Sequence, residues 1–156
     1  MSDNVDIRAW QLQDIPAIAS IMATHTLWQH YGVTDASAEH RLTALFEKGE
    51  HGLVATRAGG VEGFVIYNAH TFGESGYIRL FGVDPHHTSA GTGSRLLSAV
   101  EQRLRQDGVG RLVLLCTEWN ERARRFYRRQ GFCEVGVLPD WVMEGTHEVL
   151  YAKMLS

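Results

Sequence analysis

The chain has 156 residues, of which 44% are hydrophobic and 21% are charged, and its formal net charge is −3. The length suits one domain over residues 1–156, and the composition is ordinary for a globular protein. The small negative charge gives nucleic acid no general attraction, so we do not expect nucleic acid as a partner. Neither a secretory signal pattern nor an apolar run of membrane-spanning length is visible, which predicts a cytoplasmic protein without a membrane partner.

The hydrophobic pattern predicts alternating strands and helices in this chain order. The first half has a strand (5–11), a helix (15–31) with Asp14 as N-cap, a helix (35–49) and three strands (52–56, 61–69 and 77–83). The second half has a helix (93–107), a strand (112–116), a helix (121–130) with Asn120 as N-cap, and two strands (132–138 and 147–154) separated by a loop at 139–145. This βααβββαβαββ order predicts an α/β fold (α+β by some schemes). Because helices follow strands twice in the middle of the chain, the sheet should be mixed, with a parallel pair there.

The two cysteines, Cys116 and Cys133, lie in apolar, strand-like runs and form no CxxC pair. Without a secretory signal, they are expected to be reduced and buried. Eight histidines are present, but His25 and His30 are five residues apart, and a metal-binding pair on one helix face needs i, i+4 spacing. We therefore predict no metal site.

The segment 77–104 combines a β-prone run, a loop of small residues and a helical pattern. Such a strand, loop and helix present free backbone N–H groups to a phosphate, and Gly91 and Gly93 have no Cβ to obstruct its approach. The loop lacks the third glycine of the dinucleotide-binding pattern, and no Gly-Lys-Ser/Thr follows, which excludes a P-loop. On these residues alone, both a phosphate site and an ordinary strand-to-helix turn stay open.

A second segment, 120–132 (N-E-R-A-R-R-F-Y-R-R-Q-G-F), begins the next strand–helix unit. Together the two segments resemble the GNAT family of N-acetyltransferases, whose loop pattern is Gln/Arg-x-x-Gly-x-Gly/Ala. The loop corresponds to residues 88–93, with Gly91 and Gly93 at its glycine positions. The later motif matches Asn120, Ala123, Phe126, Tyr127, Gly131 and Phe132. The resemblance covers essentially the whole chain and implies a mixed sheet of about seven strands with helices on both faces.

The resemblance also implies acetyl-CoA as the acetyl donor. The backbone of the loop would bind its pyrophosphate, and the end of the preceding strand, where Gly82 suits a β-bulge, would bind its pantetheine arm. The N–H of Val83 would polarise the thioester carbonyl, and Tyr127 would be the general acid that protonates the departing thiolate. The implied cofactor-binding residues are Phe81, Gly82, Val83, Thr88, Ser89, Ala90, Gly91, Thr92, Gly93, Ser94, Asn120 and Tyr127.

Two positions depart from the family pattern. Thr88 replaces the usual Gln or Arg at the start of the loop, which shortens or removes one side-chain contact to the pyrophosphate. Tyr77 stands where several relatives have a glutamate as general base, and a neutral tyrosine accepts a proton from an ammonium poorly. The candidates for the base are therefore Glu118, which leads by position, and Glu74, His25 and His30.

These observations predict an acetyl-CoA-dependent N-acetyltransferase that acts on a primary amine of a small molecule or a peptide N-terminus. Because neither cysteine belongs to a cofactor motif, direct transfer in a ternary complex is favoured over an acetyl-enzyme. The alternative is a non-catalytic acyl-CoA-binding or regulatory module that kept the cofactor site and lost the base. Dimerisation of many relatives makes a homodimer a further expectation.

Overall fold

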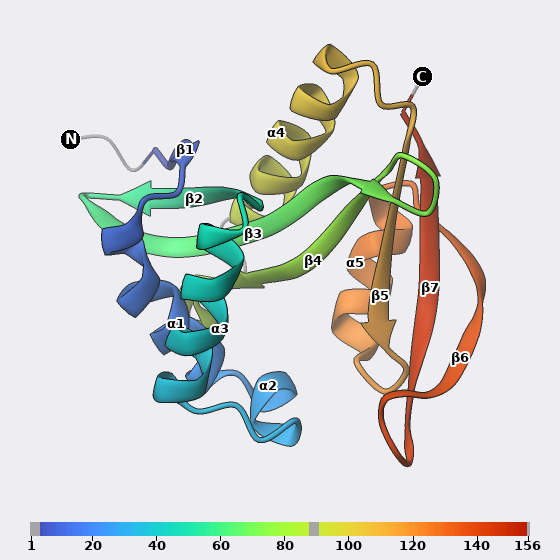
Figure 1. Ribbon diagram of the computed structural model, residues 1–156, viewed down its shortest axis with the longest axis horizontal. Helices are drawn as coiled ribbons and strands as arrows, with labels where there is room; N and C mark the ends of the chain where they lie inside the picture. Colours follow the sequence, from blue (N-terminus) through green and yellow to red (C-terminus); the bar gives the residue numbers. More distant parts are fainter. Residues whose placement is uncertain (1–3, 88–90, 156) are drawn as a thin grey trace. The chain divides into compact units, whose positions relative to one another are not determined.

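The structure is a computed structural model, and it describes residues 4–87 and 91–155. Its elements follow the chain in the order shown in Figure 1. They are β1 (Asp6–Ala9), η1 (a 3₁₀ helix, Leu12–Asp14), α1 (Ile15–Thr24), α2 (Thr26–His30), α3 (Asp35–Glu47), β2 (His51–Arg57), β3 (Gly60–Thr71), β4 (Ser75–Val83), η2 (a 3₁₀ helix, Pro85–His87), α4 (Thr92–Gln106), β5 (Arg111–Thr117), α5 (Glu121–Arg129), β6 (Cys133–Met143) and β7 (Thr146–Met154).

The seven strands form one mixed sheet in the order β1-β2-β3-β4-β5-β7-β6. The pairs β1–β2, β2–β3, β5–β7 and β6–β7 are antiparallel. The parallel pair is β4–β5, in which residues 76–78 lie opposite residues 112–114. The mixed sheet and its parallel pair in the middle of the chain confirm the predicted fold class.

By its contacts the chain forms two compact units, Met1–Tyr67 with Leu80–Val100 (the first unit) and Asn68–Arg79 with Glu101–Ser156 (the second unit). In the first unit, α1, α2 and α3 bury an apolar cluster that includes Trp28 and, from β3, Phe64 and Ile66. Gly63, next to Phe64, points to the other face, because a Cβ there would lie 3.0 Å from Cδ1 of Leu96 in α4. Helices therefore cover both faces of the sheet in this unit, as predicted.

In the second unit, α5 packs on β7. The side chain of Tyr151 is fully buried, lies opposite Leu114 of β5 in the register, and has the ring of Tyr127 at 5.9 Å. The neighbours of Gly76 leave no room for a side chain at this position, because a Cβ would lie 2.6 Å from Cδ1 of Leu104 in α4. The helices and strands of this unit therefore meet at close packing distance.

One prediction for the first helix was wrong, and another was right in part. The predicted helix over 15–31 is two helices, because His25 is extended (φ −82°, ψ 134°) between α1 and α2. Asp14 stands at the N-cap position of α1 as predicted, but its side chain makes no capping hydrogen bond to that helix. Its carboxylate instead accepts two hydrogen bonds from Arg8 (2.8 Å each) and one from the N–H of Gln11 (2.7 Å). The Asp14 carboxylate thus binds Arg8 of β1 and the backbone at the start of η1, and does not bond to the first turn of α1.

The predictions for β6 were also partly wrong. This strand runs through Pro139 to Met143, where a loop was expected. It tolerates the proline because it is the last strand in the sheet order and its register shifts between Leu138 and Met143. Cys133 is exposed, since most residues of β6 are exposed, whereas Cys116 in β5 is buried as expected.

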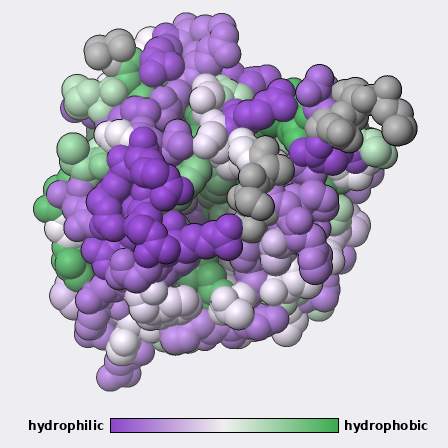
Figure 2. All heavy atoms as spheres, turned by 180° about the vertical axis from the view of Figure 1, so that it is seen from behind, coloured by the Kyte–Doolittle hydropathy of each residue, from purple (hydrophilic) through white to green (hydrophobic). Residues whose placement is uncertain are grey.

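Hydrophilic residues cover most of the face shown in Figure 2, and the hydrophobic ones form small, separate areas. Among the described residues, no helix has both the length and the apolar character needed to cross a membrane.

Candidate functional site

The end of β4 carries three of the predicted cofactor-binding residues, and the structure explains the glycine among them. A Cβ at Gly82 would lie 2.7 Å from Cη2 of Trp28 and 2.9 Å from Cε1 of Phe64. Both aromatic side chains are buried, so neither can move away easily. Gly82 therefore lets the indole of Trp28 close over the strand, while Phe81 and Val83 beside it are half-buried. The predicted bulge at Gly82 stays a prediction.

The direction of the Val83 peptide follows from two hydrogen bonds. The N–H of Asp84 donates to the carbonyl oxygen of Glu62 in β3 (2.7 Å). In a trans peptide the C=O and the next N–H point in opposite directions, so the Val83 carbonyl points away from β3. His25 meets it there, with its Nε2 2.5 Å from the Val83 oxygen. Because the N–H and C=O of one strand residue leave by the same edge, the Val83 N–H faces this side as well.

The loop and the first turn of α4 are described in part. Thr88, Ser89 and Ala90 lie outside the described residues. Gly91 has a φ of +77°, a left-handed conformation that favours glycine. Thr92 begins α4 and is fully buried, with its hydroxyl donating to Oε1 of Glu62 (2.7 Å). Gly93 and Ser94, in the same first turn, are half-buried.

Glu62 in β3 is a site-supporting residue that the sequence analysis missed. Its side chain is 3% exposed and accepts hydrogen bonds from Arg57 (2.8 and 3.2 Å) and Thr92, with Nε2 of His87 at 3.7 Å. Burial raises the pKa of this carboxyl, but the bonds from Arg57 and Thr92 outweigh burial and hold the pKa below its usual value.

Glu62 thereby holds the chain on both sides of the loop. Its backbone oxygen binds Asp84 before the loop, and its carboxylate binds Thr92 after it. The available signal was a single carboxylate inside an otherwise apolar strand pattern, V-E-G-F-V-I.

Asn120 precedes α5 in the second unit and caps it as predicted. Its Oδ1 accepts from the N–H of Ala123 (3.3 Å). This bond satisfies one of the free N–H groups of the first turn. A contact of Asn120 with a cofactor stays a prediction.

Tyr127 lies on α5 and is 8% exposed, with its ring 5.7 Å from that of Phe132 and 5.9 Å from that of Tyr151. Burial raises the pKa of its phenol, and the nearby Cys116 raises it further. A tyrosine hydroxyl is protonated at neutral pH even at its ordinary pKa of about 10, and the upward direction of this shift preserves that state, which a proton donor requires.

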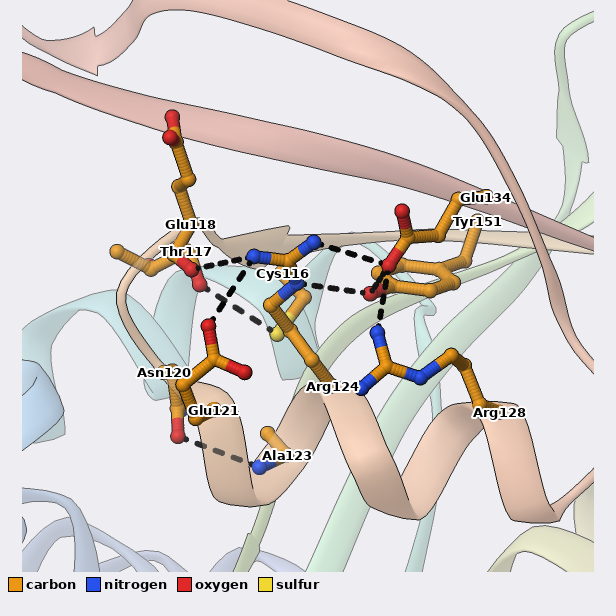
Figure 3. A network of polar contacts seen from close by, with 10 residues as sticks. All are labelled: Cys116, Thr117, Glu118, Asn120, Glu121, Ala123, Arg124, Arg128, Glu134 and Tyr151. Atoms are coloured by element: carbon orange, nitrogen blue, oxygen red, sulfur yellow. Dashed lines mark hydrogen bonds and ion pairs between the residues drawn. The ribbon is translucent and has the colours of Figure 1, made fainter.

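A polar network ties α5 to β6 and β7 (Figure 3). The hydroxyl of Tyr151 donates to Glu134 (2.7 Å) and accepts from Nε of Arg124 (3.1 Å). Arg124 and Arg128 also donate to Glu134, at 3.0 and 2.8 Å, and Arg124 donates to the backbone oxygen of Glu118 (2.9 Å). The hydroxyl and the guanidinium groups lower the pKa of Glu134 to about 2. Two of the arginines of α5 therefore have a structural role next to the turn that carries Asn120.

The predicted base candidates differ in their surroundings. In Figure 3 the side chain of Glu118 points away from the network, and it is exposed. Glu74 is exposed in the turn before β4, and His30 is exposed at the end of α2. Tyr77 is half-buried, with the guanidinium of Arg79 5.5 Å from its ring centre. In the first unit, the ring of His25 hydrogen-bonds to the backbone oxygen of Val83, a predicted site residue.

Among the described residues, no group of three or more His, Cys, Asp or Glu side chains could hold a metal ion.

A comparison with protein families identifies one family for this chain. Residues 11–132 match the model of the acetyltransferase (GNAT) family, while a comparison with curated proteins finds no match. Among solved structures, the chain is similar to the ribosomal-protein-S18-alanine N-acetyltransferase of Escherichia coli, at 20% identity and a TM-score of 0.81 over 98% of this chain and 95% of that one. It is also similar to Ard1 of Thermoplasma volcanium, at 25% identity and a TM-score of 0.79 over 96% and 97%.

A third structure is that of yncA from Salmonella typhimurium, which contains its cofactor acetyl-CoA. It has 20% identity and a TM-score of 0.75 over 97% of this chain and 94% of that one. At these identities the structural similarity establishes the fold.

Proposed function

The chain belongs to the acetyltransferase (GNAT) family, which uses acetyl-CoA as acetyl donor, and on this basis we propose that it acetylates a primary amine. The acceptor is a small molecule or a peptide N-terminus. The acetyl group moves directly from acetyl-CoA to the amine within a ternary complex.

The cysteines support direct transfer over an acetyl-enzyme. Burial raises the pKa of Cys116 to about 12, and the charge of Glu148 adds to this, so the thiol stays protonated and unreactive at neutral pH. Cys133 is exposed on β6 and lies outside both motifs. Neither side chain therefore suits the role of a nucleophile.

The observation that carries the proposal is the buried phenol of Tyr127 on α5, inside the region that matches the family model. When the amine nitrogen attacks the acetyl carbon, a C–N bond forms, the C–S bond breaks and a thiolate leaves. Tyr127 gives its proton to that sulfur, and the Val83 N–H donates a hydrogen bond to the oxyanion that forms in between. The loop at 88–94 binds the pyrophosphate, supported by the attachment of Thr92 to Glu62.

Two measurements test this function. Acetyl-CoA should raise the melting temperature, by an amount that grows with its concentration, because it binds the native state. A thiol-release assay with a panel of amines should show turnover that falls about 100-fold or more in Tyr127→Phe, as expected when a general acid is lost. Tyr67→Phe is the matched control, since it removes another buried hydroxyl and should leave turnover intact.

The alternative, a non-catalytic acyl-CoA-binding module, is kept because Tyr77 occupies the position where relatives have a glutamate base. Tight acetyl-CoA binding without turnover on any amine would support the module and refute the transferase. The absence of any acetyl-CoA effect on the melting temperature would refute both. The single domain over 1–156, the cytoplasmic location and the homodimer remain predictions; light scattering of the purified protein tests the last of these.

A further inference from the structure

His25 interrupts the first helical segment and carries a side chain that the proposed mechanism has not used. It is extended between α1 and α2, and its ring packs edge-on against Trp28, with centroids 5.4 Å apart and planes at 89°. Trp28 is itself buried against Gly82. The break between α1 and α2 thus places the imidazole of His25 against the end of β4. In a continuous helix, residue 25 would instead be part of the helix surface.

The hydrogen bond of His25 determines which ring nitrogen carries the proton. A carbonyl oxygen can only accept, so Nε2, 2.5 Å from the Val83 oxygen, must be the donor. In the neutral ring Nδ1 then has the lone pair. Among the described residues, the ring makes no other hydrogen bond. His25 is therefore held in the tautomer that leaves Nδ1 able to accept a proton.

The location of this nitrogen follows from the Val83 peptide. The Val83 carbonyl points away from β3, because the N–H of the same peptide is bound to Glu62. The N–H of Val83, which is proposed to bind the thioester oxygen, leaves by that same edge. The imidazole of His25 thus lies on the side of β4 where the acetyl carbonyl would bind.

The geometry points to His25 as the general base that takes the proton from the acceptor amine, through Nδ1 directly or through one water molecule. This inference rests on the proposed function and identifies the base that the sequence left open. The ammonium gives one proton to Nδ1, which passes it to solvent, and the neutral nitrogen attacks the acetyl carbon. After the attack the nitrogen loses a second proton. That proton restores the Tyr127 hydroxyl, which has given its own proton to the sulfur. The products are an amide, a thiol and one proton.

The charged groups around the end of β4 are engaged elsewhere. The carboxylate of Asp84 accepts from the N–H of His86 (2.9 Å) and lies 3.9 Å from Nδ1 of His87. Glu62 binds Arg57 and Thr92, and on α2 the ring of His30 packs on Tyr31. Because these groups also titrate, a change in the pH profile is assigned to His25 only by comparing the wild type with a His25 variant.

His25→Gln separates the base from the hydrogen bond. The amide nitrogen of glutamine can still donate to the Val83 oxygen, but glutamine has no basic atom. We expect the acetyl-CoA-induced rise in melting temperature to be kept and kcat to fall about 100-fold. We also expect the acid limb of the kcat/KM profile to disappear, and activity to return partly at high pH, where the amine is already neutral. The matched control His40→Gln, at an exposed histidine of α3, should keep both kcat and the acid limb.

Three outcomes would overturn the inference. One is a His25→Gln variant that keeps more than half of the wild-type kcat and also keeps the acid limb, while Tyr127→Phe is inactive. The proposed function would then stand, but His25 would not be its base. Another is a ¹⁵N NMR spectrum of the wild type in which neutral His25 carries its proton on Nδ1. The third is a wild type that acetylates no amine, which refutes the proposed function and the role of His25 together.

Discussion

Thr92→Val tests whether the attachment of the loop to Glu62 is as strong as the structure indicates. The substitution replaces one hydroxyl by a methyl group of similar size and keeps the β-branched shape. Thr92 is fully buried, and its hydroxyl donates to Oε1 of Glu62, which is 3% exposed, at 2.7 Å. The change therefore removes one buried hydrogen bond to a charged group and little else.

The expected cost follows from these contacts. A hydrogen bond to a charged group contributes about 1.5–3 kcal/mol to the free energy of unfolding. Glu62 keeps its two bonds to Arg57, at 2.8 and 3.2 Å, so it is not left without a partner and the larger penalty for an unpaired buried charge does not apply. For a chain of this length, 1 kcal/mol corresponds to about 2–4 °C, so the melting temperature should fall by about 3–12 °C.

The dependence on pH gives a second, independent check. The folded protein lowers the pKa of Glu62, so the stability from its charged form is fully present above the ordinary carboxyl pKa. That stability is lost as the pH falls through the pKa of the folded state. The difference in melting temperature between wild type and Thr92→Val should therefore be largest near neutral pH and should shrink on acidification.

Thermal unfolding followed by circular dichroism measures both effects. Thr43→Val is the matched control, because its hydroxyl donates to the Glu39 oxygen at the surface of α3 (2.8 Å), and its loss should cost less than about 0.5 kcal/mol. If Thr92→Val melts within 1 °C of the wild type, or if Thr43→Val is destabilised equally, the attachment to Glu62 does not have the strength inferred here.

Two further predictions concern packing and thiol reactivity. Gly82→Ala should lower the free energy of unfolding by about 1–3 kcal/mol in urea titrations, because its Cβ would lie 2.7 Å from the Trp28 ring. Gly136→Ala, whose Cβ meets no heavy atom within 4 Å, should cost far less, and equal losses would contradict the packing argument. With a thiol reagent, exposed Cys133 should react in the native protein, whereas Cys116, buried and with a pKa of about 12, should react only on unfolding. Rapid modification of two thiols in the native state would show that Cys116 is accessible.

The features that depend on near neighbours along the chain were predictable. Period-two and helical patterns located α4, α5 and every strand except the second half of β6 to within a few residues. Asn120 caps α5 because a cap is a contact between residues three apart. Glycine positions and spacing in the two motifs were enough to indicate the family that the comparisons confirm.

Contacts between different structural elements decided the rest. Asp14 binds Arg8 instead of capping α1, and the first helix breaks at His25, whose ring bonds to Val83 fifty-eight residues later. Glu62 reads as an isolated charge in a strand until folding brings Thr92 to it, thirty residues along the chain. Local patterns measure how a residue suits its own helix or strand, and they contain no information on which distant group will satisfy a buried donor or acceptor. The sequence alone therefore indicated the cofactor and its loop and listed His25 among several candidates for the base, whereas the contact of His25 with Val83, which favours it over the others, came only from the tertiary structure.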